Sequence, residues 1–286
     1  MSLENVEIET PENFDFLSVI HSHPWAWLEP FDWDEEKKEL RRIERFQDGK
    51  VVKLLITQKG DKLIVKVDGN SEATEIRARV RWMFRMDDDL SEFYEVCSHN
   101  HKLAPAIGKG RILRSSTIFE DIVKTLCTTN LRWRQIVPMV ARLVTQLGTP
   151  IARKPEYHAF PTPAQIAGVD EEFLRKKIKM GYRADYILEF ARNVKDGKFD
   201  PNKLRFMGSE DAYKTLKSIK GVGAFSSAYI LMLLGHYDYI PVDGYAKSFV
   251  SNEFYDGKEV DSKEIYEIFN SYGKWKALAF WFYEGR

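Results

Sequence analysis

The sequence predicts an α+β fold, in which a small amino-terminal antiparallel β-sheet domain precedes a mainly helical region. Residues 51–67 contain two runs of strand-forming residues around the turn Lys59-Gly-Asp, which is typical of a β-hairpin. From about residue 116 the apolar residues recur at helical spacing. We therefore expect an α+β domain over residues 1–98 and a helical region over residues 99–286.

The other elements follow from the same patterns. Residues 76–84 fit either a further strand or the start of a helix. The acidic run Asp87-Asp88-Asp89 opens the next helix, because acidic residues favour helix amino termini. Four helices are then expected, over residues 119–126, 136–147, 170–180 and 183–194.

Residues 213–235 indicate two helices joined by the turn Gly221-Val222-Gly223, with Gly235 as the stop of the second. Glycine permits positive φ and close backbone approach, so unpaired N–H groups at the start of the second helix could bind an anion. An ordinary helix–turn–helix corner is the alternative, since such turns are common. A nucleotide-binding loop is disfavoured, because no Gly-Lys-Ser/Thr follows and Ser226 occupies the third glycine position of a dinucleotide motif.

One carboxylate follows this hairpin closely. Asp243 stands after Ile240-Pro-Val, at the expected start of a third helix, where the helix dipole favours the ionised form. A plain helix N-cap is the alternative role, and one aspartate can serve as both cap and catalyst.

These motifs resemble the helix-hairpin-helix DNA glycosylases of the HhH-GPD superfamily. Lys220-Gly-Val-Gly-Ala-Phe and Ile240-Pro-Val-Asp243 match the family signature in order and spacing. The resemblance extends over about residues 110–285 and implies a pair of HhH-GPD helical domains. The blocks that resemble the alkylpurine and 8-oxoguanine branch are Arg114-Ser-Ser-Thr-Ile-Phe-Glu-Asp, Cys127-Thr-Thr-Asn-Leu-Arg-Trp-Arg, Phe160-Pro-Thr-Pro and Gly181-Tyr-Arg-Ala.

One departure bears on the mechanism that the resemblance implies. The 8-oxoguanine branch carries a nucleophilic lysine two residues after the second hairpin glycine, where this chain has Phe225. The alkylpurine branch has an aromatic residue there. The sequence therefore predicts a monofunctional glycosylase of base excision repair that hydrolyses the N-glycosidic bond of alkylated, 3-methyladenine-type purines.

In that interpretation Asp243 is the catalytic residue. It would stabilise the oxocarbenium-like sugar and orient water. An alkylated purine already carries positive charge, so an aromatic pocket could hold it. Most aromatic residues of a helical protein belong to its core. The pocket candidates, in order of preference, are Phe225 and Tyr245, then Trp133 and Trp281.

The resemblance also implies residues that contact double-stranded DNA. Asn130 and Leu131 lie where the family places the wedge that fills the space of a flipped base, although Leu131 could be buried and Asn130 could be a helix cap. Tyr182 resembles a second intercalating residue, and Arg183 a contact to the widowed base. Phosphate contacts are expected from the hairpin turn and from two lysines. The turn residues are Gly221, Val222 and Gly223, and the lysines are Lys220 and Lys247.

Charge is distributed unevenly along the sequence. Residues 1–98 contain 14 Lys/Arg and 22 Asp/Glu, a net charge of −8, so the remaining 29 and 21 give +8. The basic part contains the hairpin, which supports an anionic partner. The amino terminus has no apolar signal segment, and no apolar run approaches the about 20 residues of a membrane span.

The remaining expectations concern cofactors and assembly. The six histidines lack the spacing of a metal site, and two cysteines cannot supply a four-cysteine iron–sulfur cluster, so no metal or other cofactor is predicted. The resemblance allows only a weakly bound monovalent cation at the hairpin carbonyls. We expect a monomer in the cytoplasm, associated with the nucleoid if the source is prokaryotic.

Two other functions fit parts of the sequence. The Phe160 and Gly181 blocks would suit an 8-oxoguanine-type glycosylase with lyase activity. A non-enzymatic helix-hairpin-helix module would bind damaged and intact duplex alike, without base release.

Overall fold

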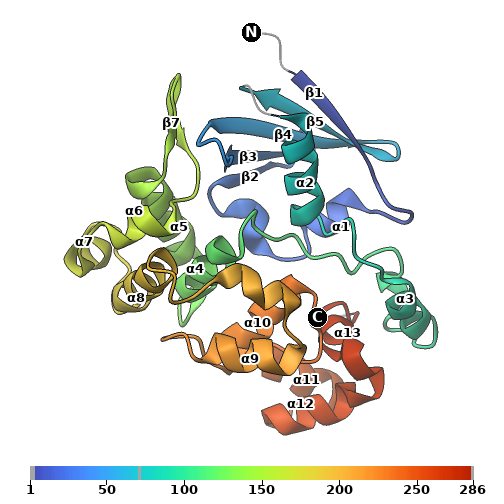
Figure 1. Cartoon of the computed structure of the whole chain (residues 1–286). Helices are drawn as coiled ribbons and strands as arrows, with labels where there is room; N and C mark the ends of the chain where they lie inside the picture. The colour runs from blue at the N-terminus through green and yellow to red at the C-terminus, as the bar shows by residue number, and fades with distance from the viewer. Residues whose placement is uncertain (1–3, 70–71, 285–286) are drawn as a thin grey trace. The chain divides into compact units, whose positions relative to one another are not determined.

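The chain is described by a computed structural model over residues 4–69 and 72–284 (Figure 1). It divides into two compact units. The first comprises Met1–Asp87 and Arg111–Pro201, and the second Asp88–Gly110 and Asn202–Arg286. The predicted boundary between residues 98 and 99 lies inside the segment Asp88–Gly110 of the second unit, and the predicted helical region is shared between the two units, since Arg111–Pro201 groups with the sheet.

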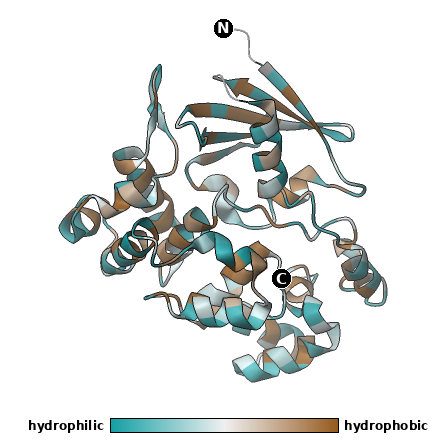
Figure 2. Ribbon diagram, in the orientation of Figure 1, coloured by the Kyte–Doolittle hydropathy of each residue, from teal (hydrophilic) through white to brown (hydrophobic). Residues whose placement is uncertain are grey.

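The first unit begins with the predicted antiparallel sheet, which has five strands in the order β1-β5-β4-β3-β2. The predicted hairpin is present as its central pair, in which Leu54 lies opposite Val67. In the first strand of this hairpin, inward side chains such as Leu54 are fully buried while their neighbours are partly exposed, as a one-sided sheet requires (Figure 2). The neighbouring strand departs from this alternation, because Arg42, Ile43 and Glu44 are all buried. The strands are β1 (Glu4–Glu9), β2 (Phe31–Asp34), β3 (Glu39–Arg45), β4 (Val51–Lys59) and β5 (Lys62–Asp68).

Helices complete this unit. Residues 76–84 proved to belong to a helix, α2 (Ala73–Met83), which packs against the sheet. The other elements are α1 (Phe16–Ile20), η1 (Pro24–Trp27), α4 (Ile118–Thr128), α5 (Trp133–Leu147), the short hairpin β6 (Pro150–Ile151) and β7 (Lys154–His158), α6 (Pro163–Ala167), α7 (Glu171–Lys176) and α8 (Arg183–Lys195).

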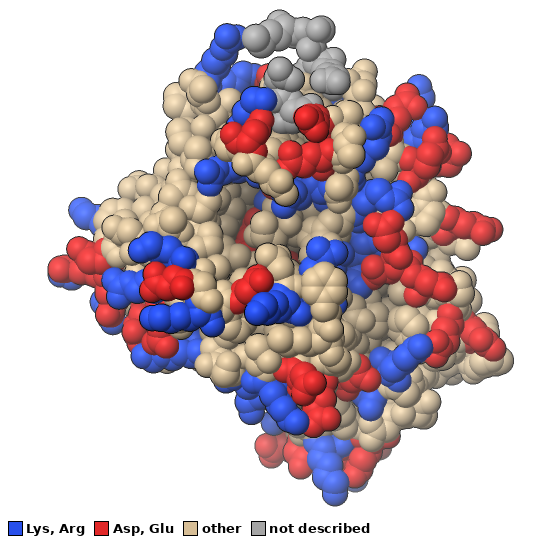
Figure 3. Space-filling model, viewed as in Figure 1, with Lys and Arg blue, Asp and Glu red and all other residues tan. Residues whose placement is uncertain are grey.

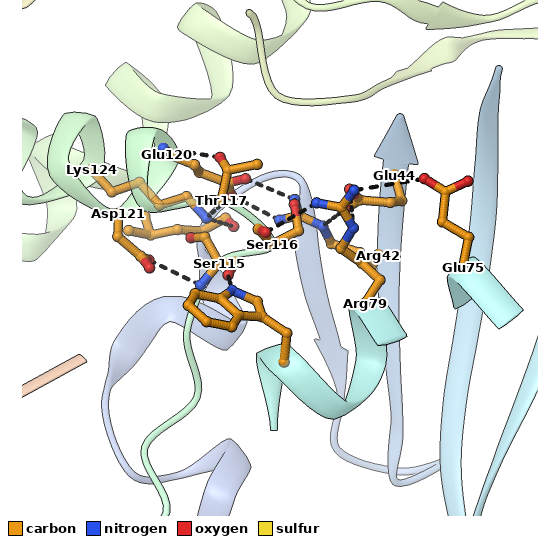
Figure 4. A network of polar contacts seen from close by, with 12 residues as sticks. Arg42, Glu44, Glu75, Arg79, Ser115, Ser116, Thr117, Glu120, Asp121 and Lys124 are labelled. Carbon is orange, nitrogen blue, oxygen red and sulfur yellow. Dashed lines mark hydrogen bonds and ion pairs between the residues drawn. The ribbon is translucent and has the colours of Figure 1, made fainter. Parts of the chain in front are cut away.

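Buried charges connect α4 to the sheet (Figure 4). Arg42 of β3 donates to both carboxylate oxygens of Glu120, each at 2.7 Å, and to Glu44 at 2.9 Å. Lys124 reaches the Glu120 carboxylate at 2.7 Å. Burial alone would raise the pKa of Glu120, but the charges of Arg42 and Lys124 outweigh it and lower that pKa to about 2. The network therefore fixes the position of α4 on the sheet.

Two more buried polar side chains join the loops to this core. Asp121 accepts hydrogen bonds from the indole N–H of Trp25 at 2.8 Å and from the amide of Ser115 at 2.9 Å. His23 donates from Nε2 to the carbonyl of Leu113 and is only 4% exposed. Burial lowers the pKa of His23 to about 3, so the ring stays neutral in the folded protein.

The second unit is helical. Its elements are α3 (Ser91–Ser98), η2 (Ala104–Ala106), η3 (Pro201–Phe206, which starts at the last residue of the first unit), α9 (Ser209–Lys217), α10 (Ala224–Leu234), α11 (Gly244–Phe254), α12 (Ser262–Phe269), η4 (Asn270–Trp275) and α13 (Lys276–Trp281). The α+β class and the helix–turn–helix at residues 213–235 are confirmed.

One helix boundary and three strands differ from the prediction. The helix expected over residues 170–180 is only α7, which ends at Lys176, and the following turn places Lys179 and Gly181 at positive φ. Strands β1, β2 and β3 were not predicted, since their polar outward residues dilute the apolar pattern.

Candidate nucleic-acid interface and active site

The hairpin turn leaves the amino terminus of α10 open. Gly221 has φ +83°, in the left-handed region that glycine tolerates best, and Val222 is buried between the helices with its N–H bonded to the carbonyl of Ile219. Gly223 is the N-cap of α10 and has no side chain to cap it. A Cβ at Gly223 would meet nothing within 4 Å. The first amides of α10 are thus arranged as an anion site requires.

Asp243 is the N-cap of α11. Its Oδ1 accepts a hydrogen bond from the amide of Ala246 at 2.8 Å. This is the carboxylate's only hydrogen bond within the described part of the chain. Asp243 is exposed and does not turn into the interior, so the structure gives it the capping role and leaves its second oxygen available to a ligand.

An aromatic row lines one side of α10. Phe225 stacks on Tyr229 with ring centroids 5.7 Å apart and planes at 15°, and Tyr229 contacts Trp281 of α13 at 5.7 Å. Tyr229 is buried, whereas Phe225 and Trp281 are partly exposed. The structure therefore joins two of the predicted pocket residues through Tyr229. Tyr245 is 59% exposed at the start of α11.

The two predicted phosphate-binding lysines are both exposed. Lys220 lies in the hairpin turn. Lys247 lies in the first turn of α11, and its charge helps to lower the pKa of Asp261, after the larger effect of the backbone hydrogen bond from Glu264. Acidic and basic side chains are interleaved on the face shown in Figure 3, so no single-sign surface dominates that view.

The first unit holds the second group of predicted residues. Asn130 follows α4 with φ +51° and is exposed, and its side-chain amide donates to the hydroxyl of Tyr182 at 3.3 Å. Tyr182 is 43% exposed and Trp133 is 37% exposed, while Leu131 is partly buried. The predicted wedge turn and the second predicted intercalating residue are therefore neighbours, although they are 52 positions apart in sequence.

Arg183 differs from these exposed residues. It is 4% exposed, and its guanidinium donates to the backbone carbonyls of Thr129 and Met180. In this conformation the side chain holds the turn at Asn130 and does not face solvent. Contact of Arg183 with a widowed base stays a prediction.

A comparison with known families identifies the superfamily of the chain. The model of the "HhH-GPD superfamily base excision DNA repair protein" matches residues 123–274, more than half of the chain. The chain belongs to the HhH-GPD superfamily.

Individual curated relatives are named as DNA glycosylases. A DNA-3-methyladenine glycosylase of Bacillus subtilis is 27% identical over 163 residues, which are 55% of this chain and 54% of that protein. The chain spans about half the length of the first curated relatives that it matches.

Two solved structures show the same HhH-GPD fold. A 3-methyladenine DNA glycosylase from Archaeoglobus fulgidus has a TM-score of 0.78 at 22% identity, with 96% of each chain covered. An 8-oxoguanine glycosylase/lyase from Clostridium acetobutylicum has a TM-score of 0.79 at 20% identity, with 99% of this chain and 97% of that chain covered. At such identities the likeness establishes the fold, and the two names differ in substrate.

The predicted site residues are distributed over both units. The hairpin, Asp243, Phe225, Tyr245 and Trp281 belong to the second unit, and the residues around Asn130 and Tyr182 belong to the first. Sequence reasoning did not select Tyr229 for the pocket or Tyr186, whose ring packs edge-on against Tyr182 at 5.7 Å. Each lies four residues after its partner on a helix, and this spacing was the available signal.

Three further properties of this HhH-GPD chain concern metals, membranes and thiols. In residues 4–69 and 72–284 no three His, Cys, Asp or Glu side chains gather closely enough to bind a metal ion. Over the same residues, every helix is too short or too polar to span a bilayer. Cys97 and Cys127 are buried free thiols, and burial raises both of their pKa values to about 12.

Proposed function

We propose that this chain is a monofunctional DNA glycosylase that removes alkylated, 3-methyladenine-type purines from double-stranded DNA. The observation that carries the proposal is the exposed carboxylate of Asp243, which caps α11 one loop after the end of α10, the helix whose amino terminus is open. The family membership supports a role in base excision repair.

The chemistry follows from the charges of the reactants. The bond from C1′ to the damaged base breaks and its electron pair leaves with the base, so a cationic alkylpurine departs as a neutral molecule. The sugar becomes oxocarbenium-like, and Asp243 stabilises that positive charge. A water oxygen then bonds to C1′, and its proton passes to the carboxylate or to solvent.

The aromatic row supports a cationic base as the substrate. The partly exposed rings of Phe225 and Trp281, which flank Tyr229, attract a cation through their electron-rich faces, by about 0.5–2 kcal/mol each. A neutral oxidised purine would gain less from such a surface. Phe225 also stands where an amine nucleophile would be needed for a covalent imine, and phenylalanine cannot form one.

DNA would be held through its phosphates and through side chains that enter the duplex. The amides after Gly223, with Lys220 and Lys247, suit a phosphate. Asn130 and Tyr182 suit the space left by an extruded base, since both are exposed and adjoin each other.

Asp243→Asn tests the catalytic assignment. Asparagine caps a helix about as well as aspartate, so the variant should keep its folding stability and its affinity for damaged duplex. Loss of the negative charge should slow single-turnover base release by about 10²-fold or more. The measurement is release of 3-methyladenine and hypoxanthine from defined duplexes, and full activity in the variant would refute the proposal.

An 8-oxoguanine glycosylase/lyase is the second candidate, favoured by the fold of the Clostridium enzyme. Borohydride separates the two, because only an imine between an amine and the sugar is reduced to a stable adduct. We expect no trapped protein–DNA adduct with 8-oxoguanine duplex, and a trapped adduct would favour the second candidate.

A further inference from the structure

The turn at the end of α4 is held from two sides. On one side, the buried network of Arg42, Glu120 and Lys124 fixes α4 on the sheet (Figure 4). On the other side, Thr129 is the C-cap of α4, and its carbonyl accepts a hydrogen bond from Nη2 of Arg183 in α8. The carbonyls at a helix end lack intrahelical donors, so this bond satisfies a group that the helix leaves open.

Arg183 has no anionic partner within the described chain. Its Nη1 reaches the carbonyl of Met180 at 3.5 Å, its Cζ lies 4.4 Å from the ring centroid of Tyr182, and its buried Nε makes no hydrogen bond. Burying a guanidinium without an anionic partner costs free energy. Here the same group touches the turn at Asn130 through Thr129 and the ring of Tyr182 directly.

The two side chains that Arg183 supports also contact each other. The Asn130 amide donates to the Tyr182 hydroxyl at 3.3 Å, and Tyr182 in turn packs against Tyr186. Asn130, Tyr182 and the Arg183 guanidinium beneath them thus form one cluster, which we call the wedge cluster. Its exposed parts are an aromatic ring and a carboxamide.

We propose that Arg183 is a positioning residue, which holds Asn130 and Tyr182 together as a preassembled wedge before DNA binds, and that it does not read the widowed base. Because its guanidinium is occupied by carbonyls, the surface left to meet that base is a ring face and an amide. A ring face stacks on any base, and an amide both donates and accepts hydrogen bonds. The wedge cluster should therefore act with every opposite base.

Fluorescence tests the positioning role without any need for catalysis. The probe is a duplex with a tetrahydrofuran abasic analogue opposite 2-aminopurine, whose emission rises when it is unstacked. At saturating protein, Arg183→Lys should give less than about half of the wild-type rise, since a lysine ammonium cannot replace the planar fork. Tyr182→Phe keeps the ring but removes the hydroxyl, so its fluorescence rise should lie between those of wild type and Arg183→Lys.

Arg142→Met is the matched control. Arg142 also donates from its guanidinium to a backbone carbonyl of the same unit, Ile178 at 2.9 Å, but it is not part of the wedge cluster. Its loss should lower stability to a similar degree and leave the fluorescence rise unchanged. If Arg183→Lys gives the wild-type fluorescence rise at saturation, the positioning role is wrong. It is also wrong if Arg183→Lys and Arg142→Met lose the fluorescence rise equally.

A second measurement separates positioning from base reading, and it rests on the proposed function. Excision of a 3-methyladenine-type lesion is measured opposite each of the four bases. Arg183→Lys should slow all four reactions by a common factor, about tenfold if the wedge supplies one well-placed interaction. A loss confined to one opposite base would show direct reading and overturn the inference. Wild-type protein that unstacks the probe but releases no base would refute the proposed function alone.

Discussion

Two helices of equal length show opposite ways of using a helix end. Both α4 and α10 have eleven residues and are largely buried. Helix α4 begins at the side-chain cap Thr117, which accepts from the amide of Glu120, and it ends at a carbonyl held by Arg183. Helix α10 begins at Gly223, which has no capping side chain.

The difference extends to their buried faces. Helix α4 carries Glu120, Asp121 and Lys124 in the interior, each bonded to other elements, whereas the buried residues of α10 are apolar except for two serines and Tyr229. Charges give α4 a unique position, since a shift of the helix would leave these charges buried without partners. Apolar packing gives α10 burial, and its open amino terminus leaves donors to a ligand. Under the proposed function, α4 holds a surface in place and α10 binds through its amino terminus.

Arg42→Met breaks the first half of this contrast and should have the largest effect on stability. The variant leaves Lys124 as the remaining partner of the buried Glu120 carboxylate. It should therefore lower the free energy of unfolding by about 3–5 kcal/mol. Denaturant unfolding measures this loss. Adding Glu120→Gln should recover part of the lost free energy of unfolding, because the substitution removes the unpaired carboxylate charge.

Lys62→Met provides the control for that experiment. Lys62 belongs to the same sheet and pairs with Glu7 and Glu9, each at 3.0 Å, but its side chain is 36% exposed. An exposed pair contributes little, so Lys62→Met should lower the free energy of unfolding far less than Arg42→Met does. Equal losses in the Arg42 and Lys62 variants would contradict the role assigned to the buried network.

Acid should act on the same core. The pKa of His23 is lowered to about 3 in the folded protein and is about 6.5 when the chain unfolds, so the unfolded state binds an extra proton as pH falls below 6.5. Unfolding free energy should then fall by about 1.4 kcal/mol per pH unit between pH 6.5 and 4.5. Below pH 4.5 Glu120 adds to the loss, because its folded pKa is about 2, while the raised pKa of Asp121 opposes it.

His23→Gln isolates this contribution. Glutamine retains an N–H donor for the carbonyl of Leu113 but does not titrate. Denaturant unfolding at intervals from pH 7.5 to 4.5 should give a flatter profile for the variant than for wild type. Parallel profiles, or a flat wild-type profile over this range, would show that His23 does not carry the acid sensitivity.

The sequence was informative about α10 because its signals are local. Two glycines flanking Val222, and one aspartate after the second helix, lie within a short stretch, and each acts through its own backbone conformation or cap. Such features depend on residue type and spacing. The hairpin, its helices and the capping position of Asp243 could therefore be predicted from the chain alone.

The features of α4 could not be predicted in this way. Arg42 and Glu120 are 78 positions apart, and Arg183 and Thr129 are 54 apart. Nothing in either local pattern specifies the partner, and an isolated arginine or glutamate is expected at the surface. Burial of Arg183 illustrates the limit, because its sequence neighbours suggested a residue facing DNA and the folded chain places it under Tyr182.

The glycine turn offers the finest test of the contrast, because its two glycines should respond in opposite directions. Gly221 has φ +83°, so Gly221→Ala should destabilise the protein by about 1–2 kcal/mol. Gly223 has the extended conformation of an N-cap, with φ −90° and ψ −170°, and has open space around it. Gly223→Ser should therefore stabilise α10 by a few tenths of a kcal/mol, as serine caps better than glycine.

The gain in stability of Gly223→Ser should be accompanied by a loss of affinity for DNA. The serine oxygen would accept the amide that a phosphate otherwise binds, and loss of one such bond, about 1.4 kcal/mol, weakens affinity about tenfold. Thermal unfolding and equilibrium binding to a damaged duplex measure the two effects in the same protein. A variant that is both more stable and equally tight in binding would show that the open end of α10 is not where the phosphate binds.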